Sequence, residues 1–287
     1  MKKPSFRKSG PIGPSRLGPK AAEDEVIEAP ADPRGLSLRA MIPNTITAAA
    51  IASGLTGIRF AFEGEWAFAV LAIILAGVLD GMDGRVARLL NAQSRFGAEL
   101  DSLADSLSFG MAPALILYMW SLQNLDVFGW FAALGFAICC ALRLARFNAQ
   151  IDIDEQPHKS AGFLTGVPAP LGAGLAFTPF YIWNETGIEF FRDPIVLSIW
   201  IGLIAVLMIS NIATLSWGAI RPRRGIRLML IALTTIAFAA LLREPWWSLT
   251  VISAVYLALM PYALVKYARI KRRRAAEQAP TPGEASV

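Results

Sequence analysis

The sequence predicts an all-α polytopic membrane protein, a bundle of about eight transmembrane helices. Of its 287 residues, 55% are hydrophobic, and the mean hydropathy is +0.48. These values are too apolar for an ordinary soluble domain. The apolar residues are gathered into runs near the roughly 20-residue length that spans a bilayer core. The runs begin at Ala40 and recur to about Val265, so most of the chain is expected to lie in a membrane.

The two ends of the chain have a different composition. Residues 1–38 scatter lysine and arginine among proline, glycine and a short acidic patch, which is typical of a disordered tail. They lack the apolar core of a cleaved signal peptide, so the first hydrophobic helix is expected to act as an uncleaved insertion signal. Residues 269–287 are expected to form a second tail, since the stretch from Ala275 is rich in alanine, proline and glutamate.

Eight segments between the tails have the length and composition of membrane spans. Pro43 suits the start of the first, because proline is favoured in the first turn of a helix. The turn at residues 91–95 is short, so the second and third segments should form an antiparallel hairpin. The expected spans are residues 41–62, 65–90, 95–120, 126–148, 166–184, 195–217, 225–242 and 247–267.

The basic residues predict how the chain is oriented. If the N-terminus is cytoplasmic, only Arg59, Arg192 and Arg243 of the basic residues near the span ends lie outside, as the positive-inside rule requires. The chain is therefore expected in the inner (cytoplasmic) membrane with both termini in the cytoplasm. The net charge of +5 then reflects contact with anionic lipid headgroups, and nucleic acid is not an expected partner.

Four aspartates stand at the junction of the second and third spans. Asp80 and Asp83 end the second span, and Asp101 and Asp105 lie in the third. Ionisable groups at membrane depth are costly and usually mark function. At about 100° per residue, each pair lies on one helical face, together with Gly84 on the second span. The hairpin allows these two faces to meet.

Converging carboxylates repel one another unless cations or protons neutralise them. Oxygen-only ligands favour Mg²⁺ or Mn²⁺, and a pair of such ions can assist an in-line phosphoryl displacement. Gly84 would let a diphosphate approach the helix backbone, and Arg88 would supply a guanidinium for its charge. Gly97 is expected to allow close packing of the second and third spans.

Two other interpretations of the aspartates remain open. They could form an ordinary solvated helix end with charge pairs to Arg85, Arg88 and Arg95. They could also form the ion site of a divalent-cation transporter, although that interpretation leaves Gly84 and Arg88 without a role.

The spacing D-x2-D-G-x2-A-R-x8-G-x3-D-x3-D, read from Asp80 to Asp105, resembles the motif of the CDP-alcohol phosphotransferase family at every fixed position. The resemblance implies two divalent metal ions on the aspartates, with Asp105 also acting as general base, and CDP contacts from Gly84 and Arg88. It further implies a six-helix membrane core, assigned here to residues 39–217, with two additional transmembrane helices in residues 218–268. A homodimer is also expected.

Three further segments look like the branch of this family that uses CDP-diacylglycerol and L-serine. They are residues 43–47, 142–148 and 163–170. In the first segment, Asn44 and Thr47 lie one turn apart, where they could bind the cytidine or its phosphates. Helix capping is the alternative role of these two residues.

Arg143 and Arg146 are the candidates for binding the acceptor. They lie near the cytoplasmic end of the fourth span, and the planar fork of an arginine suits a serine carboxylate. Snorkelling toward lipid phosphates is the alternative. The predicted reaction is metal-dependent transfer of a phosphatidyl group from CDP-diacylglycerol to L-serine, with CMP released on the cytoplasmic side. Glycerol 3-phosphate, an inositol compound or choline remain alternative acceptors.

Overall fold

The computed structural model describes residues 38–149, 163–210, 213–215, 225 and 227–277. By its internal contacts the chain divides into two units, Met1–Gly35 and Leu36–Val287, and all described elements belong to the second. Apart from Leu38, the predicted N-terminal tail at residues 1–38 lies outside the described residues, as do residues 278–287 of the predicted C-terminal tail.

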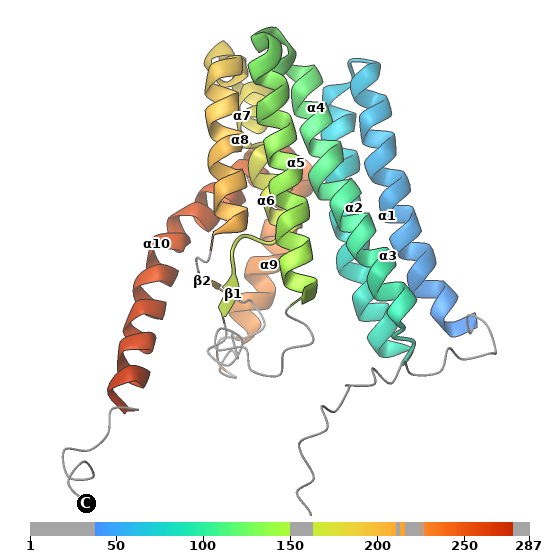
Figure 1. Cartoon of the computed structure of the whole chain (residues 1–287), viewed down its shortest axis with the longest axis vertical. Helices are drawn as coiled ribbons and strands as arrows, with labels where there is room; N and C mark the ends of the chain where they lie inside the picture. Colours follow the sequence, from blue (N-terminus) through green and yellow to red (C-terminus); the bar gives the residue numbers. More distant parts are fainter. Residues whose placement is uncertain (1–37, 150–162, 211–212, 216–224, 226, 278–287) are drawn as a thin grey trace, which may run out of the picture. The chain divides into compact units, whose positions relative to one another are not determined.

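Helices make up most of the described chain, together with one short pair of strands (Figure 1). Strand β1 (Phe163–Thr165) pairs antiparallel with β2 (Ala213–Leu215). The helical elements in chain order are α1 (Leu38–Phe62), α2 (Trp66–Leu89), α3 (Arg95–Asp105), η1 (Ser106–Met111), α4 (Ala112–Trp120), η2 (Leu122–Leu125), α5 (Asp126–Ala149), α6 (Ala169–Ala176), α7 (Thr178–Thr186), η4 (Glu189–Arg192), α8 (Pro194–Ile209), α9 (Arg227–Arg243) and α10 (Pro245–Glu277).

Within the described residues, four helical stretches are long and apolar enough to cross a membrane, and three more are apolar but shorter. All seven coincide with predicted spans, and α6 with α7 covers the remaining one at residues 166–184. The predicted all-α polytopic bundle is thus confirmed. The four long stretches are Arg39–Phe62, Trp66–Leu89, Arg95–Trp120 and Leu122–Ala149, and the shorter ones are Pro194–Ile209, Leu228–Arg243 and Pro245–Pro261.

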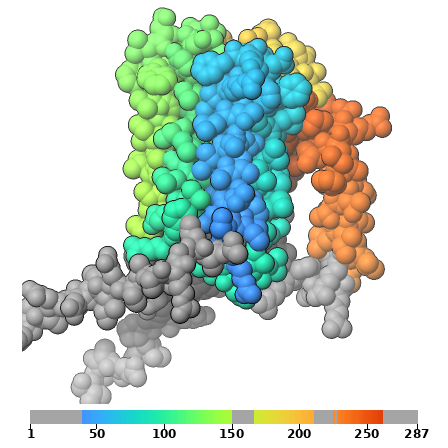
Figure 2. Space-filling model, turned by 90° about the vertical axis from the view of Figure 1, so that its right-hand side faces the viewer, coloured from blue at the N-terminus to red at the C-terminus, as the bar shows by residue number. Residues whose placement is uncertain are grey.

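The outward surface of the bundle is apolar. Figure 2 looks onto α1, drawn in blue, where large side chains such as Met41, Ile42 and Leu55 are exposed. Soluble proteins rarely present contiguous apolar surface of this kind, whereas hydrocarbon chains cover it at no cost. This exposure is what an integral membrane protein requires.

The buried core gathers large side chains from α4, α7 and α8. Trp120 of α4 meets the ring of Phe180 of α7 edge to face, with centroids 5.4 Å apart, and Tyr181 beside it is also buried. Leu197 and Ile201 of α8 are completely buried, and α8 packs along α5. This packing holds α5 in place and so fixes the helix that carries Arg143 and Arg146.

The third span, predicted at residues 95–120, is present as Arg95–Trp120, but it is not α-helical throughout. Its middle turn, η1, is π-helical and packs against both α1 and α5. Ser108 Oγ donates to the Ala50 carbonyl at 3.3 Å. On the other side, a Cβ at Gly110 would lie only 3.2 Å from the Cys140 Cβ. Close approach to two neighbours thus coincides with the irregular turn.

The sixth predicted span ends earlier than expected. Residues 195–217 were predicted, but α8 ends at Ile209 because the chain turns extended at Ser210 and enters β2. The Val167 N–H, just after β1, donates to the Leu207 carbonyl at 3.4 Å. The last helix deviates in the other direction, since α10 continues to Glu277, ten residues beyond the predicted end of its span at 267.

Candidate active site

Three aspartates from two helices converge at one end of the bundle. Oxygen atoms of Asp80 on α2 and of Asp101 and Asp105 on α3 all lie within 4.8 Å of one another. The pair on α3 is one helical turn apart, so both side chains share a face, as predicted. Ser94 caps α3 by accepting the Gly97 N–H at 3.0 Å, which fixes where this face begins.

The chemistry of this triad fits a divalent cation. Asp80 and Asp105 lie within hydrogen-bonding reach of each other, although two carboxylates side by side repel unless a proton or a cation intervenes. The other oxygen of Asp105, Oδ1, is buried and has no hydrogen-bond partner among the described residues. A cation is the kind of partner that satisfies such an oxygen.

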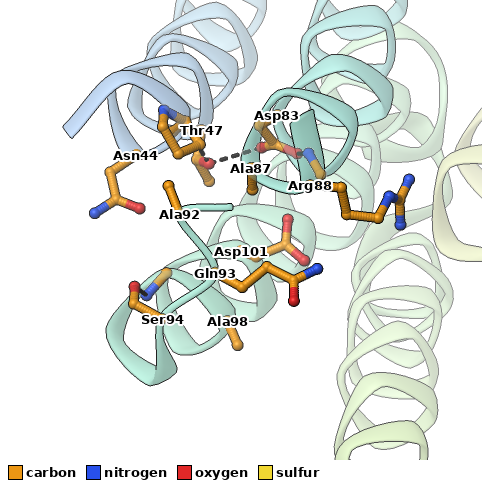
Figure 3. A pocket seen from close by; sticks show the side chains of 13 residues that line it. Asn44, Thr47, Asp83, Ala87, Arg88, Ala92, Gln93, Ser94, Ala98 and Asp101 are labelled. Carbon is orange, nitrogen blue, oxygen red and sulfur yellow. Dashed lines mark hydrogen bonds between the residues drawn. The ribbon is translucent and has the colours of Figure 1, made fainter. Parts of the chain in front are cut away.

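Asp83, the fourth predicted ligand, is held differently from the other three. Its side chain is only 5% exposed, and its Oδ2 accepts a hydrogen bond of 2.7 Å from the Thr47 hydroxyl on α1 (Figure 3). It remains close enough to interact electrostatically with Asp80 and Asp101. The structure therefore separates the four aspartates into a triad and a neighbour oriented by α1.

A cavity of about 440 Å³ opens beside the aspartates, between α1, α2 and α3. The candidate residues for binding CDP all line it. At Gly84 a Cβ would meet no heavy atom within 4 Å, so this stretch of backbone is accessible from the cavity. Arg88 forms no ion pair with a described carboxylate, and its guanidinium is free to meet a ligand's charge. The lining residues shown in Figure 3 are Pro43, Asn44, Thr47, Asp83, Gly84, Ala87, Arg88, Ala92, Gln93, Ser94, Gly97, Ala98 and Asp101.

Gly97 allows a close approach, but to a different helix from the one expected. Close packing with the second span was predicted. Instead, a Cβ at Gly97 would lie 3.0 Å from Asn44 Oδ1 on α1 and 3.1 Å from Ser94 Oγ. The glycine thus brings α1, with Asn44, against the start of α3. The Asn44 amide thereby becomes part of the cavity wall.

The two candidate arginines for the acceptor have different surroundings. Arg143 interacts electrostatically with Asp105, and its Nε is buried without a hydrogen-bond partner among the described residues. Arg146 donates to the carbonyls of Ile209 at 2.7 Å and Ser210 at 3.4 Å. Cations stabilise a helix C-terminus. Arg146 therefore holds the end of α8, while Arg143 lies within electrostatic range of Asp105.

Sequence reasoning missed two polar contacts that organise this end of the bundle. The bond from Thr47 to Asp83 joins residues 36 positions apart. The amide of Asn148 on α5 donates to Ser102 Oγ on α3 at 2.8 Å. The sequence held only an indirect indication of the second contact, because Asn148 lies in residues 142–148, one of the segments that carried the family resemblance.

Comparison with known proteins identifies the family. The family model described as CDP-alcohol phosphatidyltransferase matches residues 40–216 of the sequence. This range includes all the residues of the candidate active site. The chain belongs to the CDP-alcohol phosphatidyltransferase family. It is accordingly an enzyme, and its acidic triad is a site that could hold a divalent ion. A second model, described as CDP-alcohol phosphatidyltransferase 2, matches residues 226–261, where the sequence had offered no motif.

Several curated proteins named CDP-diacylglycerol–serine O-phosphatidyltransferase are similar to this member of the family. The one from Mycobacterium tuberculosis (strain H37Rv) is 38% identical over 239 residues, which are 83% of this chain and 83% of the relative. The one from Helicobacter pylori (strain 26695) is 33% identical over 79% of this chain and 91% of the relative. The one from Bacillus subtilis is 36% identical over 60% of this chain and 88% of the relative.

Proposed function

We propose that this enzyme transfers the phosphatidyl group of CDP-diacylglycerol to the hydroxyl of L-serine, giving phosphatidylserine and CMP. The observation that supports the proposal is the position of Arg143, whose partly buried guanidinium lies within electrostatic range of Asp105 of the acidic triad. A serine carboxylate needs a cationic partner, and its hydroxyl needs a base nearby. The names of the relatives support the same donor and acceptor.

Asp80, Asp101 and Asp105 would hold two divalent ions, Mg²⁺ or Mn²⁺, with Asp83 contributing from beside the triad. Carboxylate oxygens are the ligands that these ions prefer. When bound, the ions would polarise the phosphoryl group and neutralise charge on the departing oxygen. The orphaned Oδ1 of Asp105 supports this assignment.

The cavity between α1, α2 and α3 would receive the CDP part of the donor. At Gly84 no side chain obstructs the diphosphate, and the space that a Cβ would occupy is open. Arg88 supplies a guanidinium on the same wall. Asn44 is available to the cytidine or its phosphates. Thr47 is already engaged by Asp83, so its contribution to CDP binding would pass through the orientation of that carboxylate.

The chemical step would be a single displacement at phosphorus. Asp105 accepts the proton of the serine hydroxyl while Arg143 holds the serine carboxylate. The serine oxygen then forms a bond to the phosphorus that bears the diacylglycerol, and the bond from this phosphorus to the CMP oxygen breaks. CMP departs with that electron pair, and phosphatidylserine stays in the membrane.

The active site would face the cytoplasm, with both termini on that side, because this orientation leaves few basic residues outside. Serine and the released CMP are then exchanged with the cytoplasm, and the lipid donor enters from the inner leaflet. We also propose that the enzyme works as a homodimer, as the family resemblance implies.

The test is to supply the purified protein with labelled CDP-diacylglycerol, Mg²⁺ or Mn²⁺, and a panel of alcohols, and to identify the lipid formed. Phosphatidylserine and CMP should appear with L-serine, and Asp105→Asn should abolish both. CMP release only with glycerol 3-phosphate, an inositol compound or choline would refute serine as the acceptor. Sustained divalent-ion flux through vesicles without CMP formation would favour a transporter instead.

A further inference from the structure

Helices α3 and α5 carry the two halves of the proposed acceptor site. Asp101 and Asp105 lie on α3, and Arg143 lies on α5. The two spans approach each other closely five residues after Asp105, at η1, where a Cβ at Gly110 would lie 3.2 Å from the Cys140 Cβ. Helix α5 packs on α8, η1, η2 and α4 much more than on α3 itself. Packing on α8 holds α5 in the bundle, but direct packing between α5 and α3 contributes little to the separation of Asp105 and Arg143.

A hydrogen-bond chain joins the two helices again beyond this point. The Asn148 amide of α5 donates to Ser102 Oγ at 2.8 Å. The Ser102 hydroxyl in turn donates to the Ala98 carbonyl of its own helix at 3.1 Å. The hydroxyl thus acts as acceptor and donor at once, which fixes its rotamer. Ser102 directly follows Asp101 in the sequence, so these hydrogen bonds lie next to the triad.

Arg143 lies between these two connections along α5, three residues after Cys140 and five before Asn148. A helix segment fixed at both ends cannot tilt without breaking one contact. Loss of the distal contact would let the end of α5 move relative to α3. Small displacements of this kind are costly for a reaction that depends on the placement of two groups.

We propose that Ser102 and Asn148 are positioning residues that set the separation of Asp105 from Arg143 and thereby the binding of the acceptor alcohol. The proposal rests on the proposed function, in which the acceptor lies between these two side chains. Neither residue touches the acceptor itself. The residues that line the donor cavity belong to α1, α2, the turn after α2 and α3, and none of them lies on α5.

The experiment compares Ser102→Ala, Asn148→Ala and the double variant of the full-length protein in detergent, with CMP release measured against both substrates. Each single variant should raise the KM for serine roughly three- to tenfold. The KM for CDP-diacylglycerol should stay within about twofold of wild type. Because both changes break the same bond, the double variant should be no worse than the more impaired single variant.

Two further variants separate positioning from general stability. Ser102→Thr keeps a hydroxyl and should retain nearly the wild-type KM for serine. Ser121→Ala is the matched control, because it also removes a serine hydrogen bond between elements, the 2.5 Å bond to the Arg192 carbonyl, but at the other end of the third span. It should leave the KM for serine unchanged even if it lowers the unfolding temperature.

The outcomes distinguish the two proposals. If wild type makes phosphatidylserine but the Ser102 and Asn148 variants leave the KM for serine unchanged, or their effects multiply, the positioning role is wrong and the proposed function stands. If wild type releases CMP only with another alcohol, the serine acceptor fails, and the same KM criteria apply to that alcohol. If no alcohol releases CMP, both proposals fall.

Discussion

Replacing Thr47 by valine tests how α1 contributes to the active site. The change keeps the shape of the side chain and removes only the hydroxyl that donates to Asp83 at 2.7 Å. Asp83 is nearly inaccessible to solvent, so water would not readily replace the lost donor. Of the hydrogen bonds to Asp83 among the described residues, only that from the Gly84 N–H would remain, and the carboxylate could turn relative to Asp80 and Asp101.

The expected magnitude follows from the charge of the acceptor. A hydrogen bond to a charged group contributes about 1.5–3 kcal/mol, and a factor of ten corresponds to about 1.4 kcal/mol. If this energy holds Asp83 ready for the metal, the divalent-ion concentration for half-maximal activity should rise about 10- to 150-fold in Thr47→Val. The maximal rate at saturating Mg²⁺ or Mn²⁺ should fall much less.

The assay is CMP release from CDP-diacylglycerol and serine as a function of Mg²⁺ or Mn²⁺ concentration. Thr47→Ser, which keeps a hydroxyl, should behave nearly as wild type. Thr45→Val is the control on the same helix, because among the described residues the Thr45 hydroxyl bonds to the Met41 carbonyl of its own helix, at 2.8 Å, and not to an aspartate. A raised KM for CDP-diacylglycerol in Thr47→Val at an unchanged metal requirement would show that the hydroxyl contacts the donor, and would refute the reasoning above.

Three other predictions concern the acidic triad, the donor cavity and the two arginines. Asp101→Asn should weaken Mn²⁺ binding by about two orders of magnitude, as measured by electron paramagnetic resonance, and should nearly abolish CMP release. Substantial turnover in this variant would contradict the metal assignment. Gly84→Ala should unfold at or slightly above the wild-type temperature, since its Cβ meets nothing and alanine is the better helix former, but it should raise the KM for CDP-diacylglycerol about tenfold by occupying the diphosphate position. Arg143→Lys should raise the KM for serine by an amount corresponding to about 1–3 kcal/mol. Arg146→Lys should instead lower the unfolding temperature by about 2–4 °C, because it weakens the contacts at the end of α8. An equal rise in the KM for serine in both variants would support the prediction that Arg143 and Arg146 both bind the acceptor.

The membrane spans and the acidic site could be predicted because each depends on local sequence. Apolar runs of bilayer length specify helices whatever their neighbours are. The spacing of Asp101 and Asp105 specifies a shared face on any α-helix. The short turn after α2 brings Asp80 to the same place, so the triad needed no knowledge of the rest of the fold.

The remaining features depend on packing between distant segments. Thr47 was assigned to CDP because it stands beside Asn44 in the sequence, and only the packing of α1 on α2 reveals Asp83 as its partner. Gly97 was matched to the wrong helix for the same reason. The early end of α8 depends on the pairing of β1 with β2 across nearly fifty residues, and no local pattern at Ile209 announces it.

The π-helical turn η1 gives the third span an unusual property. A π turn accommodates one residue more than the α-helical path would, and one residue corresponds to about 100° of rotation. Asp105 immediately precedes this turn, whereas Trp120 of the buried core follows it. The extra residue therefore sets the angle about the helix axis between the face of the third span that carries the aspartates and the face that carries Trp120. Deleting Ser106 would let the third span become a continuous α-helix. That helix would then turn either Asp101 and Asp105 away from Asp80 or Trp120 out of the core. The single π-helical turn thus allows one span to direct its aspartates toward Asp80 and its buried residues toward the core.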